Sequence, residues 1–311
     1  MRTWLIAITL VVATSAEGRL AGGEARQLAA QDLDRDGIPD RLEQVLLEKF
    51  APTLLLARGE CDGVPASFTP FSASPRVAAK DATIYGQAFR IRSTDDRARI
   101  ELHFFHLWSR DCGRVGHVLD AEHVSAIVSA AWSNAAAPAW IAEAWYAAAH
   151  EDSVCDASSA ANASVIAAKR SGPRVFVSRG KHASYFDRGQ CKWGCGGDEC
   201  GDDRAIAATR IINIGEINAP LNGAIWTHSN RWPMRAKFQS DFDPALRARL
   251  DATTDHVIPL MQHRRGPQAP VLAGDTALDG LETAAESARG ALAAATRAAG
   301  RFLRKPLRKN Q

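Results

Sequence analysis

The chain has 311 residues, 46% of them hydrophobic and 23% charged, a length that can bury one large core, or one core with appendages. No internal repeat of about 20–50 residues is visible, which excludes a solenoid or a propeller. The formal net charge of +3 indicates no particular partner, and we expect no nucleic-acid partner. The sequence does not indicate an oligomeric state.

The first residues resemble a secretory signal peptide. The apolar run WLIAITLVVA follows Met1 and Arg2, and the small residues Thr14, Ser15 and Ala16 come next. This order predicts a signal peptide over residues 1–16, removed near Ala16. The run is too short to span a bilayer comfortably, and no other segment approaches that length. We therefore expect a soluble secreted or periplasmic protein, with a membrane anchor as the alternative.

An arm at residues 17–48 contains DLDRDGIPDRLE, which has the pattern of a calcium loop. Its carboxylates stand at loop positions 1, 3, 5, 9 and 12, and they are Asp32, Asp34, Asp36, Asp40 and Glu43. Gly37 stands at position 6, where such loops turn sharply. The pattern predicts a structural Ca²⁺ in loop 32–43. The alternative is an acidic turn that caps the next helix, PDRLEQVLLEKF.

Residues 49–245 consist of short β-leaning segments separated by Gly, Ser, Asp and Pro. The expected strands lie at 83–92, 100–108, 122–128, 174–179 and 205–214. Their spacing predicts a mainly β fold, an antiparallel β-sandwich with a few peripheral helices. The alanine-rich stretch 133–150 predicts one helix within this domain.

The stretch GRVGHVLDAEHVSAIV at 113–128 gathers polar residues at the start of an expected strand. Residues two apart share a face of a strand, so Asp120 and Glu122 project together and His123 faces the other way. His117 from the preceding turn and Asp111 upstream complete a mixed nitrogen and oxygen set. Such a set predicts a second divalent cation, with Ca²⁺, Mg²⁺, Mn²⁺ or a transition metal all compatible. The alternative is an ordinary strand preceded by a turn histidine.

Six cysteines form an even set for an oxidising compartment, so we expect up to three disulfides. They are Cys61, Cys112, Cys155, Cys191, Cys195 and Cys200. The cluster CKWGCGGDEC at 191–200 has an alternative reading, a zinc site of three thiolates and a histidine, although its spacing is not a usual zinc pattern.

The end of the chain divides into a linker at 246–274 and an alanine-rich helix with a basic tail at 275–311. A basic amphipathic helix can lie on anionic lipid. The alternative is a weakly held, solvated helix.

Three stretches carry a resemblance to a known family: KFAPTLLLARGE at 49–60, GHVLDAEHVSAIV at 116–128 and RVFVSRGKHASYFD at 174–187. Together with NRWPM at 230–234, they resemble the vacuolar-protein-sorting-62-related proteins, which are distantly similar to the necrosis- and ethylene-inducing-like toxins. The resemblance covers about residues 49–240 of the printed sequence.

The resemblance implies that His117, Asp120, Glu122 and, less securely, Asp111 bind a divalent cation on a sandwich that engages membrane glycolipid. It also implies that His182 of GKHASYF lies at the same end of the sandwich. Ala121 stands where the toxins usually have tryptophan, and this departure weakens the expectation of membrane action.

Three functions compete at this point. The first is a secreted, metal-stabilised module that binds a lipid or glycan surface. The second is a metal-dependent hydrolase of phosphoesters or glycans, in which His123 or His182 moves protons. The third is a structural envelope protein held by disulfides and calcium.

Overall fold

The computed structural model describes residues 31–70, 75–94, 96–113, 116–131, 138–151, 155–193, 198–201, 204–216, 244–252 and 257–259. The predicted signal peptide, the NRWPM segment and the C-terminal helix lie outside these residues.

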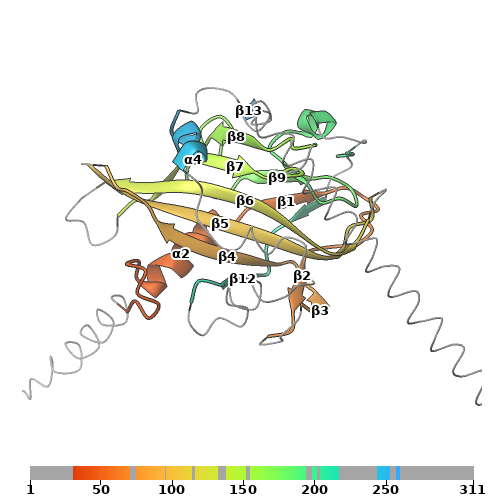
Figure 1. The fold of residues 1–311 in the computed structure, drawn as a ribbon, viewed down its shortest axis with the longest axis horizontal. Helices are drawn as coiled ribbons and strands as arrows, with labels where there is room; N and C mark the ends of the chain where they lie inside the picture. Colours follow the sequence, from red (N-terminus) through yellow and green to blue (C-terminus); the bar gives the residue numbers. More distant parts are fainter. Residues whose placement is uncertain are drawn as a thin grey trace, which may run out of the picture.

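Two β-sheets pack face to face as a sandwich, with short helices at its periphery (Figure 1). The seven-stranded sheet has the order β12-β4-β5-β6-β7-β8-β13, and the four-stranded sheet has the order β10-β9-β1-β11. The strands are β1 Thr53–Leu56, β2 Ala66–Phe68, β3 Val77–Lys80, β4 Thr83–Arg90, β5 Arg97–Arg110, β6 Val118–Ala131, β7 Ile141–Ala147, β8 Ser159–Asn162, β9 Arg174–Val177, β10 Ser184–Tyr185, β11 Arg204–Ile206, β12 Arg210–Asn213 and β13 Ile258–Pro259. The helices are α2 Asp40–Phe50, η1 Arg188–Trp193 and α4 Pro244–Asp251.

The predicted sandwich is confirmed, but its sheets are mixed instead of purely antiparallel. β1 pairs with β9 in parallel, and so does β12 with β4. The segment 205–214, expected as one strand, is divided between β11 in the small sheet and β12 in the large one. The residues between these two strands therefore carry the chain from one sheet to the other.

The long central strands β5 and β6 are buried on both faces, which explains their apolar runs. On the inner face, Phe104 and Val124 pack against Leu54 and Val175 of the small sheet. α2 covers the inner face beside β1, where its Leu47 lies against Gly86 of β4. A Cβ at Gly86 would lie 2.8 Å from a methyl carbon of Leu47, so the helix needs glycine there to come this close.

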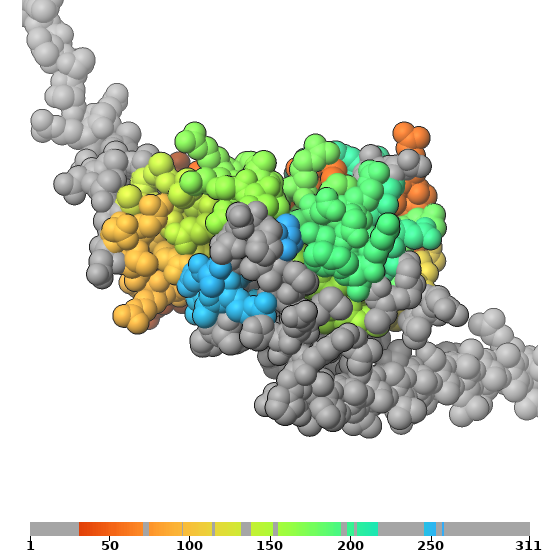
Figure 2. Space-filling model, turned by 90° about the horizontal axis from the view of Figure 1, so that it is seen from above, coloured from red at the N-terminus to blue at the C-terminus, as the bar shows by residue number. Residues whose placement is uncertain are grey.

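The outer face of the large sheet is covered by separate elements. α4 lies at the molecular surface, blue in Figure 2, and packs Leu250 against Ile127 and Tyr146. The hairpin β2–β3 packs Phe68 against Tyr85 elsewhere on this face. The boundary expected at residue 245 falls inside α4, and β13, from the expected linker, pairs with β8.

The helix predicted at 133–150 is wrong, because residues 141–147 form strand β7. Trp145 faces the inter-sheet core, where its ring lies 6.3 Å from that of Phe104, whereas Tyr146 faces outward into the cluster under α4. This alternation buries both aromatic side chains on opposite faces of a sheet. Tertiary packing therefore outweighs the intrinsic helix preference of the alanines.

Disulfides are present as expected. Cys61 pairs with Cys112 and Cys191 with Cys200, and Cys155 is also disulfide-bonded. The zinc alternative at 191–200 is therefore wrong, because Cys191 and Cys200 are not thiolates. Among the described residues, no helix is long and apolar enough to cross a membrane.

Candidate functional site

The predicted polar cluster lies between the sheets, at the end where β5 stops and β6 begins. In the β5–β6 register Asp120 stands opposite Trp108, and Glu122 stands opposite His106. Both carboxylate residues occupy the inner face, as strand geometry predicts, and they are only 3% and 5% exposed. Charged side chains this deeply buried require partners or a bound cation.

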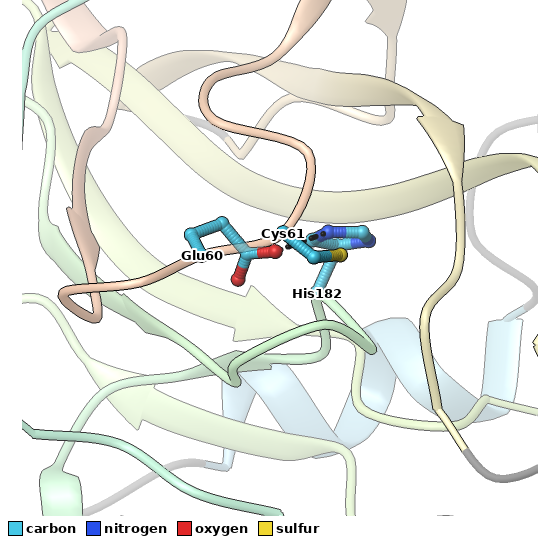
Figure 3. Close-up of side chains that lie close together, drawn as sticks. All are labelled: Glu60, Cys61 and His182. Carbon is cyan, nitrogen blue, oxygen red and sulfur yellow. Dashed lines mark hydrogen bonds and ion pairs between the residues drawn. The ribbon is translucent and has the colours of Figure 1, made fainter.

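His182, from the turn between β9 and β10, is the direct partner of Asp120. Its Nδ1 lies 2.8 Å from Asp120 Oδ2. On the other side of the ring, Nε2 lies 3.2 Å from Glu60 Oε1 (Figure 3). The ring stacks on Trp108 at a centroid distance of 3.9 Å. Burial would lower the pKa of His182, but the two carboxylates raise it to about 9. His182 is therefore a buried imidazolium at neutral pH.

Asp111 and His117 lie on the more exposed side of the same site. His117 Nε2 lies 3.9 Å from Asp111 Oδ2, and His117 Nδ1 lies 2.9 Å from the Leu119 carbonyl oxygen. Burial, followed by the charge of Asp120, raises the pKa of Asp111. Asp111 and Asp120 therefore lie close enough to repel one another.

Only some of the predicted ligands converge tightly. Within the described part of the chain, two groups of candidate ligand atoms lie mutually within 4.8 Å: Glu60, Cys61 and His182, and Asp32, Asp34 and Asp40. Cys61 is bonded to Cys112, so it supplies no thiolate to the first group. The set of Asp111, His117, Asp120 and Glu122 surrounds the same end of the sandwich without such close contact.

Asp198 is a second centre of the site that the sequence analysis missed. Its carboxylate lies 2.7 Å from His150 Nε2 and 2.8 Å from Lys181 Nζ, and it accepts a hydrogen bond from the Tyr185 hydroxyl. These partners hold the pKa of Asp198 below its usual range against the effect of burial. Burial would lower the pKa of His150, but Asp198 and then Glu122 raise it.

We define the sandwich-end site by the predicted residues together with those that the structure adds. These are Glu60, Asp111, His117, Asp120, Glu122, His150, Lys181, His182, Tyr185 and Asp198. Lys181, His182 and Tyr185 belong to a motif that the sequence analysis singled out, GKHASYF. No local spacing signals Asp198, which stands two residues before Cys200 of the Cys191–Cys200 disulfide.

His123 does not join the sandwich-end site. It lies on the outer face of β6, where its ring stacks on Phe105 and its Nε2 lies 2.7 Å from His103 Nδ1. His103 in turn contacts Glu101, which binds Arg247 of α4. The strand geometry that put His123 on the opposite face from Asp120 is therefore confirmed.

The loop at residues 32–43 has part of the predicted calcium geometry. Asp32, Asp34 and Asp40 converge, and Gly37 has φ +90°, the conformation that position 6 demands. Burial, followed by the charge of Asp36, raises the pKa of Asp34 to about 6. Crowding of carboxylates without a counter-ion has this effect.

Asp36 and Glu43 lie differently from the predicted ligand positions. Asp36 Oδ1 accepts a hydrogen bond from the Ile38 amide at 2.7 Å. Glu43 is buried on α2 and accepts a hydrogen bond from Asn213 Nδ2 at 3.0 Å. Burial, followed by a hydrogen bond with Glu216, raises the pKa of Glu43 to about 9. Glu43 is thus protonated at neutral pH in this arrangement.

No family model and no curated protein matches the chain. Solved structures with some likeness include NLPPya in complex with glucosamine, with TM-score 0.34 and 16% identity over 62% of this chain and 83% of that one. Another is necrosis and ethylene inducing protein 2 from the causal agent of cocoa's witches' broom disease, with TM-score 0.33 and 14% identity over 67% of this chain and 90% of that one. A third is described as a toxin fold for microbial attack and plant defence, with TM-score 0.34 and 15% identity over 63% and 86%. These belong to the group of toxins that the sequence motifs distantly resemble, but at such TM-scores no residue role passes to this chain.

Proposed function

We propose that the protein is a secreted, disulfide-stapled β-sandwich that holds a divalent cation at the sandwich-end site and uses it to bind a glycan or lipid head group. The cation ligands are Asp111, His117, Asp120 and Glu122. Membership of the vacuolar-protein-sorting-62-related family, as the motifs suggest, belongs to the same proposal.

The observation that carries the proposal is the charge of the site. Five carboxylates, of Glu60, Asp111, Asp120, Glu122 and Asp198, lie around the ammonium of Lys181, the imidazolium of His182 and His150, whose pKa is raised. Even with His150 counted as protonated, the carboxylates outnumber the cationic groups by two, and a divalent cation would neutralise this excess. Burial, followed by the charge of Asp120, raises the pKa of Asp111, and a bound divalent cation would relieve the repulsion between these two carboxylates.

A second cation, Ca²⁺, is proposed for the loop at 32–43. Asp32, Asp34 and Asp40 would be its first ligands, and Glu43 would have to lose its proton and turn from Asn213 to complete the set. The role of this ion would be structural, because α2 follows the loop directly and packs Leu46, Leu47 and Phe50 into the core.

Cation stoichiometry tests both assignments. After dialysis against Ca²⁺ or Mn²⁺, elemental analysis of the full chain should find two ions per molecule. Asp120→Asn should lose the sandwich-end ion alone, and Asp34→Asn should lose the loop ion alone. Asp187→Asn serves as the matched control, because Asp187 is exposed and lies outside both sites.

The outcomes separate the two sites. If the protein binds one ion, and Asp34→Asn loses it whereas Asp120→Asn keeps it, the sandwich-end proposal is contradicted and only the calcium site of the loop stands. Uptake that Asp34→Asn leaves unchanged would contradict the loop assignment.

Hydrolysis is a second candidate function, favoured by the His150–Asp198 pair beside Glu122. An aspartate that holds a partly exposed histidine is an arrangement used in general acid–base catalysis, and the raised pKa of His150 favours the role of proton donor. Cation-dependent turnover of a phosphoester or glycoside, lost in both Asp120→Asn and His150→Gln, would establish the enzyme, whereas binding without turnover would exclude it.

A further inference from the structure

Lys181 and His150, which we call the rim pair, are both held by one buried carboxylate. Asp198 is fully buried in its side chain, whereas the side chains of Lys181 and His150 are 16% and 19% exposed. An anion that arrives from solvent therefore meets the two cationic groups and not the carboxylate. The Lys181 ammonium has three N–H donors, so its bond to Asp198 leaves donors for an anion, and the charges of Asp198 and Glu122, which raise the pKa of His150 against the effect of burial, favour the cationic form of this ring.

Each member of the rim pair lies near one of the proposed cation ligands. The stem of Lys181 lies against Gly113, where an added Cβ would be 3.0 Å from Lys181 Cγ and 2.9 Å from Asp111 Oδ1. His150 lies close enough to Glu122 for the charge of that carboxylate to raise its pKa. A group bound to a cation between Asp111 and Glu122 would thus lie within reach of both rim cations.

Lysine binds phosphate oxygens as a point charge, and hard divalent cations in proteins commonly share their coordination with a ligand phosphate. A neutral sugar hydroxyl would gain little from two cations at the rim. A phosphate oxygen would gain from both of them and from the metal ion.

We propose that Lys181 and His150 form a phosphate subsite next to the sandwich-end cation, so that the ligand is a phosphorylated head group. This inference rests on the proposed function, because it requires the cation. It adds the chemical class of the ligand and gives Asp198 the task of holding both rim cations in place.

A matched pair of soluble probes tests the subsite. Glucose 6-phosphate and glucose are titrated calorimetrically into the full chain in Mn²⁺. The phosphate should tighten binding at least about tenfold, since a charge-assisted hydrogen bond contributes that much or more. Lys181→Met should remove the difference, and Lys181→Arg should keep most of it.

Lys192→Met is the control, because Lys192 is an exposed lysine on η1 outside the site. Cation stoichiometry and thermal unfolding are measured on every variant. Should Lys181→Met fail to fold, His150→Gln in the same titration decides, with a several-fold loss expected.

A second arm separates a soluble sugar phosphate from a lipid. Vesicles of phosphatidylcholine with and without phosphatidic acid are sedimented with the protein, and binding that needs both phosphatidic acid and Lys181 assigns the phosphate to a lipid head group. Two outcomes would overturn the subsite and leave the proposed function standing. In the first, the protein binds the cation but shows no preference for phosphate in either arm. In the second, it prefers phosphate, but Lys181→Met keeps the same preference. A chain without the sandwich-end cation overturns both.

Discussion

The two proposed cation sites are built in opposite ways. The loop at 32–43 takes its carboxylates from twelve consecutive positions, and Asp32, Asp34 and Asp40 remain partly exposed. The sandwich-end site collects Glu60, Asp120, His182 and Asp198 from four separate segments and buries them between two sheets. The comparison teaches that a contiguous site can keep its carboxylates partly in solvent, whereas a site assembled between two sheets must balance its buried charges for the sandwich to close.

The largest expected difference concerns Asp120. Replacing it with alanine leaves the buried imidazolium of His182 with Glu60 alone, and losing one partner of a buried ion pair costs about 3–5 kcal/mol of unfolding free energy. Urea unfolding in EDTA measures this loss. Asp187→Asn, at an exposed position where asparagine can still accept the hydrogen bond of the Gly189 amide, should stay within about 0.5 kcal/mol of the parent. If Asp120→Ala also lost less than about 0.5 kcal/mol of unfolding free energy, the ion pair with His182 would not stabilise the site, contrary to this account.

The second largest effect is expected in the pH dependence of the unfolding free energy, which His182 of the sandwich-end site should dominate at neutral to alkaline pH. The pKa of His182 rises from 6.5 to about 9 on folding, so its stabilising effect is complete below pH 6.5 and disappears as pH rises through 9. The expected loss is about 3 kcal/mol, from the free energy of each unit of pKa shift. Unfolding free energies between pH 6 and 9.5, in EDTA, would show the decline, and His182→Gln should flatten it. The same decline in His182→Gln would assign it to another group.

The smallest effect is expected in the loop without calcium. Asp34→Asn removes one of several crowded carboxylates, so in EDTA the unfolding free energy should stay within about 0.5 kcal/mol of the parent, with stabilisation as the expected direction. Calcium at a hundred times its dissociation constant should stabilise the parent by about 2.7 kcal/mol and leave the variant unchanged. Thermal unfolding with and without Ca²⁺ measures both values, and an equal calcium effect in the variant would contradict the loop assignment.

Local patterns in the sequence predict part of this molecule well. The alternation of Asp120, Glu122 and Val124 along β6 follows from strand geometry, and so does the opposite placement of His123. The positive φ of Gly37 follows from the loop pattern. Each of these features depends on residues that are neighbours in the chain.

Features that depend on distant packing could not be read in this way. The alanine-rich segment at 141–147 has a helical composition, and only the cores on both sides of the sheet make it a strand. Asp198 reaches His150 and Lys181 because a disulfide and the sandwich bring its loop there. Glu43 fits the loop pattern, yet burial beside Asn213 gives it a different partner.

The Cys61–Cys112 disulfide joins the residues that directly follow Glu60 and Asp111. The Cys112 amide also donates a hydrogen bond to the Gly180 carbonyl oxygen at 2.6 Å, and the Gly180 amide donates one to Glu60 at 2.8 Å. Three loops are thus tied to one another beside His182 by contacts within the protein itself. A ligand would find them already ordered, so little of its binding free energy would be spent on arresting loop motion.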